Sequence, residues 1–316
     1  MKKRNFLSVG VAVLLSGVLI IATSLTGNAA GNAYEQLKLL MREDHARPDN
    51  MTLTMNIDVT DNGTSVLHGE GIVKTDTAEK CMSGSIQISG MGDQGFEFYG
   101  DEDSVLLKLA GSENWYKAEP TEDRADEDDE DYDRFGGNRE HDNYELREMV
   151  MDTLMGDLKD QVVLEQANGL RTFSLTLDEG NMPVLLQTLF SAGSRDREIC
   201  DGDEYCDLDA LPQELLDFAQ ELKVYRDVID FSGDRTLNGI KLTLTVDNQN
   251  QPVAMSFTTN FRVTNDNGGS HQYQIYVSMA ISDVNTTVVD TVSPDPASII
   301  EVDTSSFEKA NHRFRR

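Results

Sequence analysis

LTMNIDVTDNG, residues 53–63, alternates strictly between apolar and polar residues over 53–59 and ends in an Asn-Gly turn. Strict alternation is typical of a strand with one buried face, because successive side chains point to opposite sides of a sheet. Asn-Gly readily supplies the positive φ angles of the favoured hairpin turns. The segment therefore predicts a β-hairpin that buries the apolar residues of its first strand, with a return strand over residues 66–74.

Similar strand patterns occur on both sides of a more helical middle section. Further strands are expected over residues 80–89, 95–99, 104–109, 115–117, 162–166, 171–177, 240–246, 253–263 and 271–282. Helices are expected over residues 33–44 and 146–158, after Pro183, and after Pro212. Because helices between two β blocks can be placed across one face of a shared sheet, the order predicts an α+β fold. We expect one large curved antiparallel β-sheet, a half-barrel, with helices covering one face.

The N-terminus has the pattern of a membrane-targeting segment. Lys2, Lys3 and Arg4 precede an uncharged stretch over residues 6–25, and small residues follow it. Residues 1–32 are therefore expected to be either a cleaved signal peptide or an uncleaved transmembrane signal anchor. The bulk of the chain is then extracytoplasmic, either held at the cell membrane or secreted.

The remaining chain is predicted to form a single extracytoplasmic domain over residues 33–300, with a C-terminal tail at 301–316. Residues 120–143 are rich in like charge and almost free of apolar residues. Self-repulsion without anything to bury predicts a disordered acidic loop there.

The charge of the chain excludes some classes of partner. Its formal net charge is −29. Nucleic-acid binding needs clustered Lys and Arg side chains facing phosphates, so a nucleic-acid partner is not expected. Attraction to an anionic membrane surface is disfavoured for the same reason. Contact with the membrane is expected through the N-terminal helix alone.

Cysteines suggest one candidate disulfide. Cys200 and Cys206 bracket the short loop CDGDEYC, and an oxidising compartment would allow them to pair. Cys81 would then be left over. Three cysteines allow three single pairings, and the sequence does not choose among them.

The same loop holds weak metal-ligand candidates. Its carboxylates alternate and could face a cation if the loop closes: Asp201, Asp203, Asp207 and Asp209. The loop fails the EF-hand pattern, because Tyr205 occupies the fifth position and no glycine occupies the sixth. No metal site is predicted, and a calcium-binding acidic surface protein stays an alternative function.

Catalytic and cofactor motifs do not emerge from the sequence. The five histidines are scattered, and neither HExxH, GxSxG, a P-loop nor a dinucleotide fingerprint occurs. We therefore predict no catalytic residues, no cofactor and no enzymatic activity.

The order of elements resembles the LolA-type lipoprotein-carrier superfamily, including lipoprotein-like exported proteins of Gram-positive bacteria. The resemblance rests on a helix at residues 34–41 leading into the strand at 53–59, a meander through Trp115 and Tyr116, and the late strand pair at 253–263 and 272–282. It implies a half-barrel sheet wrapped around helices, with an apolar hollow able to hold acyl chains. The acidic insert and the cysteine loop depart from that pattern, and a lipid-attachment cysteine is missing.

Methionines occupy several expected core-facing positions: Met55, Met149, Met155, Met255 and Met279. Methionine adapts to irregular apolar surfaces, which suits either ordinary core packing or the lining of a hollow. The predicted function is a non-enzymatic exported or membrane-anchored domain that binds a lipid or another apolar ligand. The main alternative is a cell-surface interaction or sensor module with a protein partner. A solidly packed interior would favour that alternative.

Overall fold

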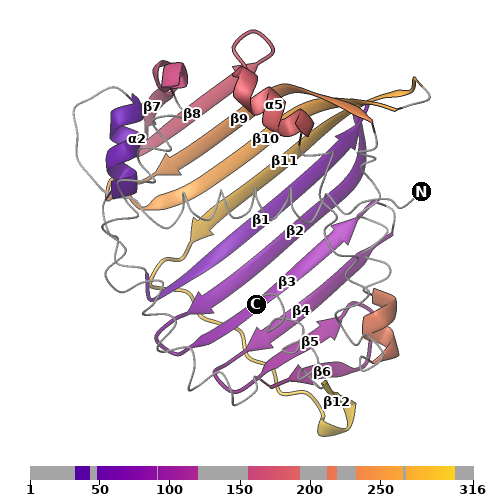
Figure 1. Cartoon of the computed structure of the whole chain (residues 1–316). Coiled ribbons are helices and arrows are strands. Elements are labelled where there is room, and N and C mark those ends of the chain that lie inside the picture. The colour runs from indigo at the N-terminus through magenta and orange to yellow at the C-terminus, as the bar shows by residue number, and fades with distance from the viewer. Residues whose placement is uncertain are drawn as a thin grey trace, which may run out of the picture.

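A single β-sheet dominates the structure (Figure 1). The computed structural model describes residues 33–42, 48–90, 92–119, 156–192, 212–218, 233–265 and 268–302. Within these residues, twelve strands form one open sheet in the order β12-β6-β5-β4-β3-β2-β1-β11-β10-β9-β8-β7. The strands are β1 (Asn50–Asp61), β2 (Thr64–Asp76), β3 (Cys81–Ser89), β4 (Gln94–Gly100), β5 (Val105–Leu109), β6 (Trp115–Ala118), β7 (Val163–Ala167), β8 (Leu170–Asp178), β9 (Asp234–Val246), β10 (Pro252–Thr264), β11 (Ser270–Ser282) and β12 (Ile299–Val302).

The two halves of the chain meet at the centre of this sheet. Strands β1 to β6 form a meander toward one edge, and β7 to β11 form a second meander that returns from the other edge. Strands β1 and β11 pair antiparallel from Thr52 and Ser282 to Asp61 and Tyr273. The prediction of one sheet shared by both ends of the chain is confirmed.

The expected hairpin turns also form. Asn62 and Gly63 have φ angles of 50° and 80°, and Asn168 and Gly169 have φ angles of 53° and 79°. Two consecutive positive φ angles characterise the type I′ turn, whose twist matches that of the flanking strands. The Asn-Gly sequences therefore set both hairpins, and the first of them is the hairpin predicted from residues 53–63.

One pairing corrects the expected all-antiparallel sheet. Strand β12 pairs with β6 in parallel, from Ile299 opposite Trp115 to Val302 opposite Ala118. After β11 at the centre, the chain crosses a face of the sheet and reaches the edge beside the start of β6. Strand β12 then runs along β6 in the same direction. The sheet is consequently mixed, and β12 extends two residues into the predicted tail.

The sheet has one apolar face, and the described helices lie against it. Helix α2 (Ala33–Arg42) buries Tyr34 and Leu40 in the same core cluster as the strands, beside β7 and the 3-10 helix η1 (Gly156–Gln161). Helix α5 (Val184–Ala192) packs on β9, and the Phe190 ring lies 5.4 Å from the ring of Phe261. Figure 1 shows both helices over the half of the sheet formed by β7 to β11.

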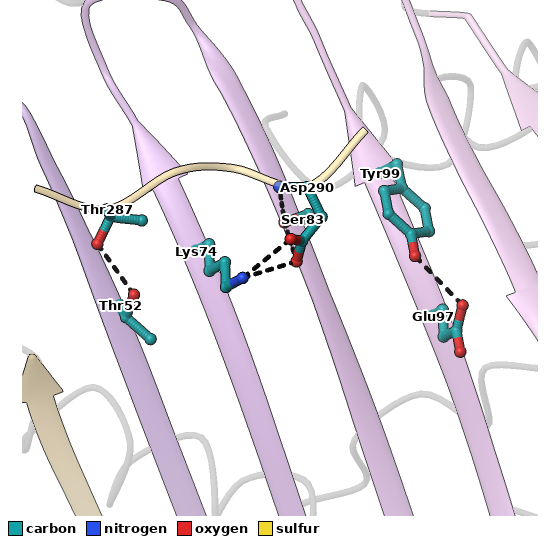
Figure 2. A network of polar contacts seen from close by, with 7 residues as sticks. All are labelled: Thr52, Lys74, Ser83, Glu97, Tyr99, Thr287 and Asp290. Atoms are coloured by element: carbon teal, nitrogen blue, oxygen red, sulfur yellow. Dashed lines mark hydrogen bonds and ion pairs between the residues drawn. The ribbon is translucent and has the colours of Figure 1, made fainter. Parts of the chain in front are cut away.

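Residues 283–298 form a strap across the opposite, polar face of the sheet (Figure 2). Thr287 hydrogen-bonds Thr52 on β1 at 2.9 Å. Asp290 accepts from Lys74 on β2 at 2.9 Å, and its main-chain N–H donates to Ser83 on β3 at 3.0 Å. The strap thus joins strands on the polar face while it carries the chain from β11 to β12.

We expect the buried contact of the strap to contribute more stability than the exposed one. Ser83 is 0% exposed, so Ser83→Ala leaves the Asp290 N–H without its acceptor and should lower the free energy of unfolding by about 1–3 kcal/mol. Lys74→Ala removes a solvent-accessible ion pair and should cost less than about 1 kcal/mol. Urea unfolding of the two variants measures the difference. Equal losses would show that the strap is not anchored at Ser83.

Several predictions lie outside the described residues. They are the signal peptide or anchor at 1–32, the acidic loop at 120–143, most of the helix at 146–158, and the loop bearing Cys200 and Cys206. In the part of the chain that the structure describes, no helix has both the length and the apolar character needed to cross a bilayer.

Candidate ligand-binding site

A hollow of about 210 Å³ opens on the apolar face at the centre of the sheet. Its walls come from β3, β2, β1, β11 and β10, and they are almost entirely apolar. The lining residues are Met55, Asn56, Ile57, Gly69, Glu70, Gly71, Ile86, Ile88, Met255, Ser256, Phe257, Ile275, Val277, Ser278 and Met279. The site therefore straddles the junction between the two halves of the chain.

Strand register explains why this lining is apolar. Residues opposite one another on neighbouring strands point to the same face. One such row, which we call the central row, crosses ten strands and contains only apolar residues and glycine: Leu109, Phe96, Ile86, Gly71, Met55, Met279, Met255, Leu244, Phe173 and Leu164. The five middle members of the row, from Ile86 to Met255, line the hollow.

The four polar lining residues contribute main chain to the hollow. Asn56 pairs with Glu70 and Ser278, and Ser278 pairs with Ser256, so the four form a row of their own. This row is one residue away from the central row, and alternation places its side chains on the opposite face of the sheet. The hollow consequently presents hydrocarbon and thioether groups, without a charged side chain, to a ligand.

Two glycines on β2 form the floor of the hollow. A Cβ built on Gly69 would lie 2.6 Å from Ile57 Cγ2, so the side chain of Ile57 occupies the space next to this glycine. A Cβ built on Gly71 would lie 3.4 Å from Ile86 Cγ1 and 3.6 Å from Met55 Cε, which are ordinary contacts. Gly71 therefore leaves room that a larger side chain would fill.

Helices border the hollow on both sides in the described part of the chain. Helices α2 and α5 pack on the β7 to β10 half of the sheet. A short helix over residues 213–218 packs on the other half, where the Phe218 ring meets the Phe96 ring edge-on at 5.9 Å. The described side chains cover the flanks of the apolar face and leave the hollow at its centre unfilled.

Glu214 holds the short helix to the end of the sheet. It accepts hydrogen bonds from Tyr116, from Ser112 at 2.8 Å and from Asn114 at 3.3 Å. Burial and the hydrogen bond with Glu214 raise the pKa of Tyr116 to about 12. The hydrogen bonds from Tyr116 and Ser112 lower the pKa of Glu214 below its ordinary value of 4.5.

These pKa shifts predict the pH range over which the contact between Tyr116 and Glu214 stabilises the protein. A lowered carboxyl pKa gives stability that is complete above pH 4.5 and disappears as the pH falls through the lowered value. A raised Tyr116 pKa gives stability that is complete below pH 10 and disappears as the pH rises through about 12. We expect Glu214→Gln to lower the urea midpoint at pH 7, and the difference from the wild type to shrink progressively as the pH falls below 4.5. A difference that does not shrink over that range would contradict this assignment.

Reactive side chains lie elsewhere. Burial and the nearby carboxylates of Asp76 and Glu79 raise the pKa of the Cys81 thiol, which disfavours its nucleophilic thiolate form. His68 and His271 contact Asp58 and Asp61 at 2.6 and 2.8 Å. The hollow is lined by none of these seven residues. Among the described residues, no group of three or more His, Cys, Asp or Glu side chains is placed to hold a metal ion.

The structure brings together three of the methionines noted in the sequence. Met55, Met279 and Met255 are consecutive members of the central row and all line the hollow. Met149 and Met155 lie outside the described residues, as do the weak metal candidates Asp201, Asp203, Asp207 and Asp209 and the disulfide candidates Cys200 and Cys206. Sequence reasoning missed Gly69 and Gly71, although two glycines on the apolar face of a predicted strand are a signal for a cavity or a close approach.

Comparison with known proteins yields weak likenesses only. No protein-family model and no curated protein sequence matches the chain. A structure of lipovitellin, described as showing lipid–protein interactions, aligns with 79% of this chain and 27% of its own, at 7% identity and a TM-score of 0.24. A LolA superfamily protein from Nitrosomonas europaea aligns over 78% of this chain and 90% of its own, at 7% identity and a TM-score of 0.19. Similarity scores this low support no inference about function, which is therefore inferred from the hollow.

Proposed function

We propose that this protein is a non-enzymatic exported domain that binds a lipid or another apolar ligand in the hollow at the centre of its sheet. The observation that carries the proposal is an apolar hollow with a glycine floor and methionine walls, left open by the described side chains. We further propose that the sheet curves as a half-barrel around this ligand.

The energetics of packing support a ligand. Protein interiors are usually close-packed, and an apolar surface exposed to water costs about 25 cal/mol per Å². An engineered apolar cavity of about 150 Å³ stays dry and binds benzene, and this hollow is about 210 Å³. A hydrocarbon chain or ring of similar or slightly larger size would restore the missing contacts.

The chemistry of the hollow also restricts the ligand. A charged or strongly polar group would lose its hydration without gaining a partner, because the lining side chains are apolar. The ligand inside the hollow is therefore uncharged hydrocarbon, and any polar headgroup stays outside it. Methionine side chains can adjust to different ligand shapes, which suits a family of related lipids better than one rigid molecule.

Export forms part of the same proposal. It is supported by the positively charged start and the apolar stretch at residues 6–25. An extracytoplasmic location, at the membrane or released from it, would place the domain where lipid-bearing molecules are available.

Ligand binding to the full chain tests the proposal. Native mass spectrometry of protein purified from its host should show a co-purified apolar molecule. After its removal, the neutral fluorophore N-phenyl-1-naphthylamine should bind with saturable fluorescence and be displaced by that molecule. A clean apo mass together with no saturable fluorescence would refute lipid binding and favour a protein-interaction module.

A further inference from the structure

We propose that Met55, Met279 and Met255 form an oxidation site, at which a hydroperoxide converts their thioethers to sulfoxides and so releases the apolar ligand. The inference rests on the proposed function, because the ligand is the one that the hollow binds. It identifies the three methionines as the residues through which ligand affinity responds to oxidants.

The three side chains are concentrated where a change of polarity has the largest effect. They occupy adjacent positions of the central row on three neighbouring strands. Met255 is 8% exposed, and Met55 and Met279 are half-buried. Because Met55 and Met279 keep part of their surface exposed and share the hollow with Met255, an oxidant as small as hydrogen peroxide that enters the hollow meets all three thioethers.

The chemistry needs only the methionine and the oxidant. The thioether sulfur attacks the distal oxygen of the hydroperoxide, the O–O bond breaks and an S–O bond forms. Sulfur loses two electrons to become a sulfoxide, and hydrogen peroxide is reduced to one molecule of water. This reaction turns a flexible apolar side chain into a polar, chiral one.

The surroundings provide no partner for the new oxygen. The lining side chains are apolar, and the main-chain groups of these interior strands are paired in the sheet on both sides. A sulfoxide must therefore either remain in water, holding the hollow open to solvent, or lose its hydration against the ligand. Either outcome weakens the binding of an apolar molecule.

Other methionines provide an internal control. Met51 and Met82 lie outside the hollow, and Met82 is 40% exposed. Met182 is 8% exposed and also lies outside the hollow. Oxidation of these three residues should therefore leave the ligand site unchanged.

The experiment combines hydrogen peroxide treatment of the full chain with N-phenyl-1-naphthylamine titration and peptide mapping by mass spectrometry. Wild-type affinity should fall at least tenfold when the three hollow methionines are oxidised. In a hollow variant with Met55→Leu, Met255→Leu and Met279→Leu, peroxide should change the affinity by no more than about threefold from that variant's own untreated value, because leucine has no sulfur to oxidise. A control variant with Met51→Leu, Met82→Leu and Met182→Leu should lose affinity as the wild type does.

Each further outcome gives a decision. Equal loss of affinity in the hollow variant and the wild type would overturn the proposal, as would full affinity of wild-type protein whose three hollow methionines carry oxygen. Absence of fluorophore binding before oxidation, together with a clean apo mass, would instead overturn the proposed function. Peptide mapping would still test the oxidation site in that case. The proposal requires that Met55, Met255 and Met279 are oxidised to sulfoxides in the folded protein.

Discussion

Gly71→Leu will strongly weaken binding of N-phenyl-1-naphthylamine while the protein stays folded. A Cβ at residue 71 meets only ordinary contacts, so the backbone accepts the substitution and the remaining side-chain atoms extend into the hollow. Four carbons of leucine replace a similar amount of bound ligand, and each buried methylene is worth about 0.8 kcal/mol. We expect affinity to fall by about a hundredfold, and fluorescence titration measures it.

The same substitution should stabilise the ligand-free protein. Leucine buries apolar surface that glycine leaves exposed, and it removes backbone freedom from the unfolded chain. We expect the free energy of unfolding to rise by about 1–2 kcal/mol in urea titrations. Lower affinity together with higher stability separates a filled site from a damaged fold.

A matched control adds the same bulk to the other face of the sheet. Ala280 neighbours Met279 on β11, is exposed, and faces away from the hollow. Ala280→Leu should therefore leave fluorophore affinity within about twofold of the wild type. Equal loss of affinity in Gly71→Leu and Ala280→Leu would show that the fluorophore binds outside the hollow.

Gly84→Ala will destabilise the protein, although Gly71→Ala will not. A Cβ on Gly84 would lie 2.5 Å from the main-chain oxygen of Ile72 and 2.6 Å from Cζ of Phe98. Because a main-chain oxygen within a paired strand cannot move alone, strands β2 and β3 must shift, and overpacking of this kind costs about 1–3 kcal/mol. Gly71→Ala adds a methyl group that meets its neighbours at ordinary van der Waals distances of 3.4–3.6 Å, and it should gain about 0.4–1 kcal/mol.

Urea unfolding of the two alanine variants tests this contrast. Both glycines lie on the apolar face of neighbouring strands, so intrinsic strand preference affects them alike. The free energy of unfolding should fall in Gly84→Ala and rise in Gly71→Ala. Stabilisation of both variants would mean that Phe98 does not pack over Gly84 as the structure has it.

Local patterns in the sequence were sufficient to predict most strands and the turns between them. Alternation at residues 53–59 and the Asn-Gly pairs specify which residues face inward and where the chain reverses. Strand β9 was predicted to begin at residue 240, yet it begins at Asp234. A bulge shifts the register between Asn260 and Phe261, so Leu237 and Ile240 both face inward and break the alternation.

The candidate site was less accessible to sequence reasoning. Alternation identifies the face on which a side chain lies, but it does not identify the residues opposite it on strands from distant parts of the chain. Met55, Met279 and Met255 form one row only once β1 pairs with β11 and β11 with β10. The parallel strand β12 was missed because four residues after a proline-rich segment give too short a pattern.

The central pairing of β1 with β11 has a consequence for how the protein is made. Thr52 and Ser282 become neighbours only after β11 has been made, so the first meander must wait with an unpaired edge. Folding is slow when contacts must form between residues so far apart in the sequence, and the apolar strands stay exposed for longer. An incomplete chain that lacks β11 would therefore keep the edge of β1 exposed and be more prone to aggregate than the chain with both meanders.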